Sequence, residues 1–303
     1  MATPRQEQDT VVFIPDEQSS GKFFDPSTPR LQFQFGAATH PGNVRPNNED
    51  HFAVMKRRRT SELLLTNLVP DNLVLADDSD FVMVVADGMG GAQFGEFASQ
   101  MALQRMFELA QQATSWVMKF TNLDDLQIRE RVNAYVKEIQ ATLQEFVEAD
   151  PALAGMGTTW TLAHLLPSDA LIVHIGDSRA YLMHDGELHQ VTHDETMAQA
   201  LIDGGMDPNR VKKFRHMLLN SLGGESDNVT AQIHHVQMDP GDQLLLCTDG
   251  LNDMVGDEEI ANILKQTSAS QAVCDRLVAA ALERGGKDNV TVVLAAASRF
   301  QSS

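Results

Sequence analysis

Alternating and continuous apolar positions divide much of the chain into strands. Residues 31–35 alternate between apolar side chains and glutamine, which is the period of a half-buried strand. Asp185-Gly186 separates two short apolar segments and predicts a tight hairpin turn. Other short apolar runs predict strands at residues 52–55, 81–85, 158–165, 171–175, 180–183, 244–247 and 290–295.

Helical spacing of apolar residues marks three longer segments. In residues 98–113 the apolar side chains recur at intervals of four, four, three and four residues. An amphipathic stripe runs through residues 123–149, and a third helix is expected at residues 270–283. Because the helices cluster in the sequence and short turns join consecutive strands, the pattern predicts an α+β fold with antiparallel sheets.

Two segments lack this periodicity. Residues 1–32 are rich in Pro, Gln, Ser, Asp and Thr, so we expect a flexible arm with residues 11–14 as its only apolar patch. The basic run at residues 56–59 opens an insert that extends to residue 80. A solvated loop is the expectation for this run, and a docking patch for acidic phosphoproteins is the alternative. Residues 33–298 are then one folded domain.

Composition narrows the choice of partners. The chain of 303 residues has 42 acidic and 23 basic side chains, and its net charge of −19 disfavours binding to nucleic acid and anionic membranes.

The spacing of Cys247 and Cys274 is not that of a disulfide framework or a thiolate metal site. No segment has the roughly 18 apolar residues of a membrane span, and the N-terminus has no secretory pattern. A cytoplasmic location follows as the expectation.

Acidic residues next to Gly or Asn recur at the ends of the predicted strands. The five positions are Glu49-Asp50, Asp87-Gly88, Gly176-Asp177, Asp249-Gly250 and Asp288-Asn289. A single Asp-Gly pair is most often only a turn. A carboxylate beside a buried strand is unfavourable unless water or a cation meets it there, and glycine lets the backbone approach closely. Five such positions therefore favour a site for hard divalent cations over five independent turns.

These positions also belong to an ordered set of motifs. Together the motifs resemble the metal-dependent (type 2C) protein serine/threonine phosphatase family, and the Met-Gly-Gly after Asp87-Gly88 is similar to its bacterial branch. The resemblance implies a four-layer α-β-β-α sandwich, with two antiparallel sheets flanked by helix pairs, and a phosphatase catalytic domain over residues 33–298. The matching stretches are Arg45-Pro46-Asn47-Asn48-Glu49-Asp50, Val85-Ala86-Asp87-Gly88-Met89-Gly90-Gly91, Gly157-Thr158-Thr159, Gly176-Asp177-Ser178-Arg179, Leu222-Gly223-Gly224, Thr248-Asp249-Gly250 and Asp288-Asn289.

The resemblance implies two adjacent metal sites. Asp87 should bridge two Mn²⁺ or Mg²⁺ ions, helped by the backbone carbonyl of Gly88. Asp249 and Asp288 should complete one site, and Glu49-Asp50 should hold the other ion, partly through water. Oxygen ligands in fixed positions suit Mg²⁺ or Mn²⁺ better than zinc. Two such ions lower the pKa of a bridging water and clamp the phosphoryl oxygens.

The same resemblance implies further roles around the metal pair. Asp177, together with Asp249, matches the family's third and weaker metal site. Arg45 should bind the substrate phosphate, because its planar guanidinium matches phosphate geometry. Asp87, Asp249 and Arg45 are therefore the expected catalytic residues.

The chain departs from many eukaryotic members of the family at one position. They have a histidine where this chain has Met89, and methionine has no proton to give to a leaving alkoxide. Residues 193–216 resemble the flap of bacterial members, and an ordinary surface helix and turn is the alternative. His193 and His216 flank this segment, and a structural role is expected for both.

The function expected from these motifs is hydrolysis of phosphoserine and phosphothreonine in proteins by a water that bridges two metal ions. The expected partners are phosphorylated proteins that are targets of a serine/threonine kinase. A monomer without nucleic-acid or membrane contacts is expected. Three alternatives stay open: the same fold acting on small phosphoesters, a non-catalytic scaffold that binds phosphoproteins, and a plain interaction domain with acidic turns.

Overall fold

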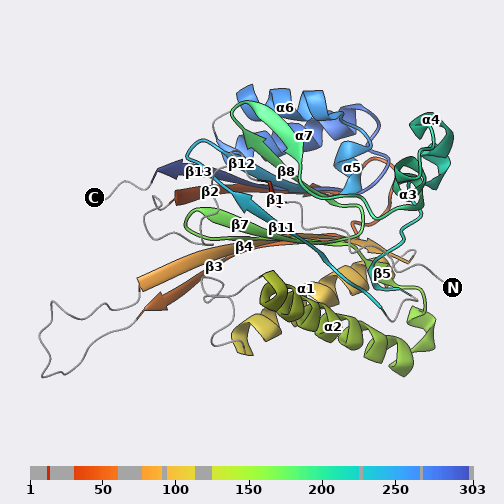
Figure 1. Ribbon diagram of the computed structural model, residues 1–303. Helices are drawn as coiled ribbons and strands as arrows, with labels where there is room; N and C mark the ends of the chain where they lie inside the picture. Colours follow the sequence, from red (N-terminus) through yellow and green to blue (C-terminus); the bar gives the residue numbers. More distant parts are fainter. Residues whose placement is uncertain are drawn as a thin grey trace, which may run out of the picture.

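The computed structural model describes residues 12–13, 31–60, 77–90, 94–112, 125–224, 228–266 and 269–299. Two β-sheets pack face to face, and helices cover the outer face of each, so the fold has four layers (Figure 1). The predicted α+β sandwich is confirmed. Most of the predicted N-terminal arm, and residues 61–76 of the predicted insert, lie outside the described residues.

Within the described residues, the first sheet has eight strands. In spatial order they are β1 (Val12–Phe13), β11 (Gln232–Gln237), β7 (Asp169–Ile175), β6 (Trp160–Leu165), β4 (Asp77–Met89), β5 (Gly157–Thr158) and β10 (Leu222–Gly223), and β3 (Asp50–Thr60) pairs with β4. All pairs are antiparallel except β1 with β11, which is parallel. The outer ends of β3 and β4 project beyond the rest of the sheet (Figure 1).

The second sheet is antiparallel throughout and has five strands. In spatial order they are β2 (Leu31–His40), β13 (Val290–Arg299), β12 (Gln243–Cys247), β8 (Arg179–His184) and β9 (Glu187–Gln190). Its central strands β12 and β13 carry the acidic motifs of the C-terminal third at their ends. Asp249 lies two residues after the end of β12 at Cys247, and Asp288 lies two residues before the start of β13 at Val290.

Helices occupy both outer layers and one end of the sandwich (Figure 1). α1 and α2 cover the first sheet, and α6 and α7 cover the second, while α3, α4 and α5 lie near the end where the acidic motifs meet. Their bounds are α1 (Phe94–Gln112), α2 (Asp125–Ala149), α3 (Met197–Asp203), α4 (Pro208–Val211), α5 (Asp249–Asn252), α6 (Asp257–Gln266) and α7 (Ser270–Glu283), with 3₁₀ turns at Pro151–Leu153 and Lys212–Phe214. None of the helices described has the length and apolar character of a membrane-spanning segment.

Three hydrophobic clusters fill the three interfaces between layers. Along β4, Val84 faces the α1–α2 pair while Met83 faces the other sheet, and both are fully buried. Along β12, Leu246 packs between the sheets while Leu245 packs against the helical layer that includes Leu277 of α7. Strands buried on both faces explain why these segments are continuously apolar in the sequence.

The structure confirms the predicted hairpin and one helix closely. Asp185 and Gly186 connect β8 to β9 with φ of 47° and 81°, the left-handed conformations that a two-residue type I′ turn requires. α7 has the predicted bounds, residues 270–283. The segment 158–165 is split into β5 and β6 at Thr159, whose hydroxyl and backbone N–H both contact Asp87.

One prediction was wrong. The basic run at residues 56–59 is not a loop, because β3 continues through it to Thr60 and stays paired with β4. Lys56 and Arg58 are exposed on one face of this edge strand, while Met55 and Arg57 on the other face are partly buried. Charged side chains on the open face of an edge strand discourage further pairing, and they conceal its alternating pattern.

Candidate metal centre

Pairing of β3 with β4 brings two of the predicted ligands together. Asp50 and Asp87 are direct neighbours across the two strands, so their side chains leave the same face of the sheet. Next to them, the N–H of Gly88 donates to the carbonyl of Glu49 at 3.2 Å. A Cβ on Gly88 would lie 2.2 Å from the carbonyl oxygen of Gly95 at the start of α1. Only glycine fits at this close approach.

Asp50 is held by two hydroxyl groups from the second sheet. Its Oδ2 accepts hydrogen bonds from Thr248 at 2.9 Å and from Thr291 at 2.7 Å. Its Oδ1 is buried and has no hydrogen-bond partner among the described residues. A buried carboxylate oxygen without a donor is unfavourable, so this atom fits the position of a cation ligand. Thr248 belongs to the Thr248-Asp249-Gly250 motif, but no role was predicted for either threonine, because a hydroxyl at a strand end is too common to single out.

Asp249 and Asp288 reach the same region from β12 and β13. Asp288 Oδ2 lies 2.7 Å from Nη2 of Arg45, and both side chains are partly exposed. The side chain of Asn289 connects the start of β13 to the loop that precedes β3. Its Oδ1 accepts from the N–H of Glu49 at 2.8 Å, and its Nδ2 donates to two carbonyls of the preceding loop. Asn289 therefore fixes the loop that carries Arg45 and Glu49 against the start of β13.

Mutual repulsion and burial shift the titration of these acids. Burial, then the charges of Asp50, Asp249, Asp177 and Asp288, raise the pKa of Asp87 well above its ordinary range. Burial is also the first cause that raises the pKa of Asp50 to about 7 and that of Asp249 to about 6, and the charge of Asp288 adds to both. The charge on each carboxylate therefore disfavours ionisation of the others. A bound cation would offset both this repulsion and the cost of burial.

The donors present fit a pair of hard divalent cations. They are carboxylate oxygens from four separate segments, together with the backbone at Gly88, and nearly all are held at strand ends. Sulfur is absent from this donor set, and the unpartnered Oδ1 of Asp50 lies within it. Oxygen ligands on rigid elements are typical of Mg²⁺ and Mn²⁺ sites. Glu49 lies at the edge, where burial raises its pKa and the charge of Arg45 lowers it.

Asp177 and Asp249 form a second acidic group beside the first. Asp177 follows β7, and burial followed by the charges of Asp249, Asp194 and Asp253 raises its pKa. One ligand atom each from His216, Asp249 and Asp253 lie within 4.8 Å of one another. The sequence predicted Asp177 and Asp249 for a third metal, but it did not predict Asp253. The spacing from Asp249 to Asp253, one turn of helix, could have identified it.

The segment 193–216 reaches this second group through His216 and through Arg215, whose Nη1 lies 3.9 Å from Oδ1 of Asp253. Its base is tied down where Leu219 N–H donates to Glu195 O at 2.7 Å and Met197 N–H donates to Met217 O at 2.8 Å. The partly buried carboxylate of Glu195 accepts from the N–H of Gly176 at 2.9 Å, next to Asp177. His193 pairs with Asp203 at 2.8 Å on the exposed part of the segment.

Comparison with known proteins agrees with this geometry. A sequence profile described as protein phosphatase 2C matches residues 71–288. The chain belongs to the protein phosphatase 2C family. It is 33% identical over 272 residues to the serine/threonine protein phosphatase PstP of Mycobacterium tuberculosis, covering 88% of this chain but 45% of that protein. The chain thus spans less than half the length of this relative.

Two further matches cover nearly all of the related protein. The serine/threonine phosphatase stp of Listeria monocytogenes is 30% identical over 260 residues, covering 84% of this chain and 92% of that protein. A crystal structure of the catalytic domain of PstP in complex with two manganese ions has a TM-score of 0.68 and 32% identity. It covers 88% of this chain and 99% of that domain. The predicted family and fold are confirmed, and the roles of individual residues stay predictions.

Proposed function

We propose that this chain is a metal-dependent protein phosphatase that hydrolyses phosphoserine and phosphothreonine in proteins. The observation that carries the proposal is the convergence of Asp50, Asp87, Asp249 and Asp288 at one end of the sandwich. The named activity of the PstP and stp relatives supports the substrate class. A non-catalytic scaffold is less consistent with the chain, because no predicted metal carboxylate is missing.

Two Mn²⁺ or Mg²⁺ ions are the proposed cofactors. Asp87 and the carbonyl of Gly88 would be shared between them, with Asp249 and Asp288 on one side and Glu49 and Asp50 on the other. When bound, such ions lower the pKa of an attacking water and stabilise charge on the phosphoryl oxygens. Phosphate monoesters are among the slowest biological esters to hydrolyse in water, so this stabilisation has to be large.

The chain's own side chains position the substrate and the ligands. Arg45 lies at the rim, 56% exposed, where its free N–H groups can meet a phosphate. Thr248 and Thr291 hold the carboxylate of Asp50 in one orientation, which is the usual role of groups behind metal ligands. Met89 has no transferable proton, so the proposed reaction does not use this side chain as an acid.

A metal-titrated phosphatase assay tests the proposal. The 303-residue chain is assayed with phosphoserine, phosphothreonine and phosphotyrosine peptides, beside sugar phosphates and nucleotides. We expect Mn²⁺- or Mg²⁺-dependent phosphate release from the first two peptides, abolished by chelator. Asp87→Asn should lower kcat about 100-fold or more, while Asp275→Asn, on the exposed face of α7, should not. Preference for sugar phosphates would favour the small-phosphoester alternative, and inactivity with every substrate would favour the scaffold.

The domain bounds, the flap, the partners and the location are also parts of the proposal. Residues 33–298 are the proposed catalytic domain, with residues 193–216 as a flap beside Asp177 and Asp249. The proposed partners are phosphorylated targets of a serine/threonine kinase, met by a monomer in the cytoplasm. Both cysteines are free and buried, as is common in a reducing compartment.

A further inference from the structure

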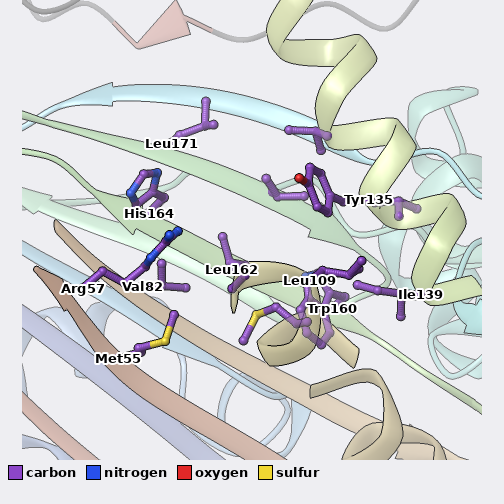
Figure 2. Close-up of a pocket in the computed structure, with 15 residues that line it drawn as sticks. Met55, Arg57, Val82, Leu109, Tyr135, Ile139, Trp160, Leu162, His164 and Leu171 are labelled. Atoms are coloured by element: carbon purple, nitrogen blue, oxygen red, sulfur yellow. The ribbon is translucent and has the colours of Figure 1, made fainter. Parts of the chain in front are cut away.

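A cavity of about 80 Å³ lies between the first sheet and the α1–α2 pair. Its walls are almost entirely apolar and come from both layers, including Met55 of β3, Leu109 of α1, Ile139 of α2 and Trp160 of β6 (Figure 2). One water needs roughly 10–15 Å³ of such space and two to four polar partners. The cavity is therefore large enough for a small organic molecule and poorly suited to water.

Two basic side chains lie at one end of this cavity. Arg57 and His164 lie together there, while Trp160 and Ile139 lie toward the opposite end (Figure 2). Nη1 of Arg57 is buried and has no hydrogen-bond partner among the described residues. A guanidinium N–H removed from water without an acceptor is unfavourable. A ligand with an anionic group would supply that acceptor.

Charged groups of both signs surround this cavity. Asp80 is the cross-strand neighbour of Arg57, and its Oδ2 lies 3.2 Å from Nε2 of His164. The positive charges of Arg131 and Arg57 both act on Tyr135 of the lining, where they oppose the rise in its pKa that burial causes.

We propose that this cavity binds a small monocarboxylate with an aromatic or aliphatic body. The carboxylate would pair with Arg57, because charge-assisted bonds to a guanidinium are strong and directional. The apolar body would lie along Leu109 and Ile139 toward Trp160, as in most small-molecule sites. The Arg57 end of the cavity is remote from the metal centre, because Met55 and Arg57 are five and seven residues along β3 from Asp50, roughly 17–24 Å at the rise of a strand.

Calorimetric titration of the 303-residue chain with phenylacetate tests the proposal. The titration is done in chelator, so its outcome does not depend on the metal centre or on phosphatase activity. The uncharged analogue 2-phenylethanol is the matched control ligand. We expect saturable binding of phenylacetate at one site, with weaker binding of the alcohol.

Two variants locate the site. Arg57→Gln should raise the Kd for phenylacetate about tenfold or more and leave that for 2-phenylethanol nearly unchanged. Arg58→Gln, on the exposed opposite face of β3, is the matched control and should leave both unchanged. Val136→Phe fills the cavity from α2 and should abolish binding of both ligands, which keeps the test valid if Arg57→Gln does not fold. Absence of saturable phenylacetate binding to the wild-type protein, or equal affinity in Arg57→Gln or Val136→Phe, would overturn the proposal.

Discussion

The two oxygens of Asp50 lie in different surroundings, and together these surroundings indicate a metal ligand. One oxygen accepts two hydroxyl hydrogen bonds, and the other is buried without a partner among the described residues. The hydroxyl bonds oppose the rise in its pKa that burial causes. They therefore partly offset the effect of burial and orient the carboxylate before a cation arrives.

Removing one of these hydroxyl groups should weaken metal binding. Thr291→Val keeps the shape of the side chain but deletes the 2.7 Å hydrogen bond to Asp50. We expect Mn²⁺ affinity to fall roughly 10-fold, because groups behind metal ligands typically matter by 10- to 100-fold. Calorimetric titration with Mn²⁺ measures this. Thr142→Val, on exposed α2, is the control, and equal Mn²⁺ affinity in Thr291→Val and wild type would contradict this role.

Arg45 should affect substrate use more than metal binding. Its guanidinium touches Asp288 from the rim and keeps other N–H groups free to meet a phosphate. Arg45→Ala should raise KM for a phosphopeptide roughly 10- to 100-fold, the range for losing hydrogen bonds between charged groups. Steady-state kinetics beside Mn²⁺ titration separates the two effects, with Arg276→Ala of α7 as a control. A large loss of Mn²⁺ affinity with KM unchanged would show instead that Arg45 supports metal binding and not substrate binding.

At the scale of elements, tight contacts between backbones align the metal ligands. A Cβ on Gly250 of α5 would lie 1.9 Å from the carbonyl oxygen of Asn289, so α5 and the start of β13 touch directly. These are the elements that carry Asp249 and Asp288. The close contact therefore fixes the separation of two predicted ligands.

Glycine substitutions test this contact. Gly250→Ala should lower the free energy of unfolding by about 1–3 kcal/mol, as overpacking usually does, and should also weaken Mn²⁺ binding. Gly256→Ala is the matched control, because an added Cβ there has nothing within 4 Å, and its effect should stay within about 0.5 kcal/mol. Urea unfolding measures both variants. Equal stability of the two variants would show that the contact can relax at little cost.

The residue pattern of each element explains which strands and helices the sequence predicted and which it missed. Strands buried on both faces and long amphipathic helices were predicted because their apolar patterns are unambiguous. β11 was missed because two histidines, His234 and His235, interrupt its apolar residues, although His234 is buried. β3 was cut short because its exposed face carries charge. α6 was missed because it is short and begins with three acidic residues, Asp257 to Glu259.

The acidic residues of the site were predictable for a physical reason, and their supporting groups were not. Carboxylates beside glycine at the ends of apolar strands are unusual, so they stand out in the sequence. Thr248 and Asn289 belong to the motifs, but no supporting role could be assigned to them or to Thr291, because only the packing of the two sheets brings them to Asp50 and Glu49. Asp253 becomes significant only through its proximity to Asp249.

Across the whole molecule, buried histidines make stability depend on pH. Burial lowers the pKa of His174 to about 4 from its ordinary 6.5, and both ring nitrogens have hydrogen bonds, to Thr161 and Gly176. Above pH 6.5 neither the folded nor the unfolded state binds the proton. Between about 6.5 and 4 only the unfolded state does, so this group destabilises the fold as pH falls through that window.

Replacing His174 should remove that part of the pH dependence. Between pH 6 and 4.5, the slope of unfolding free energy against pH should be smaller in His174→Gln than in wild type by up to about 1.4 kcal/mol per unit. Urea unfolding at several pH values, in chelator, measures the slopes. His193→Gln, an exposed histidine, is the control. Identical slopes in wild type and His174→Gln would contradict the buried neutral state of His174.

The acidic residues of the metal centre make stability fall as pH rises, which is opposite to the effect of His174. Burial and repulsion raise the pKa values of Asp50 to about 7 and Asp249 to about 6 in the folded chain. Without a cation, stability from these groups is present at acidic pH and is lost as pH rises through those values. Mn²⁺ should therefore stabilise the protein most near neutral pH, with release of protons on binding.

A manganese anomalous-difference map from a crystal soaked in Mn²⁺ tests the central claim most directly. We predict two peaks beside Asp87, one also bounded by Asp249 and Asp288 and the other by Glu49 and Asp50. Phosphate release by the same protein should stop in excess chelator. A map without a peak among these carboxylates, together with phosphate release that persists in chelator, would contradict the account.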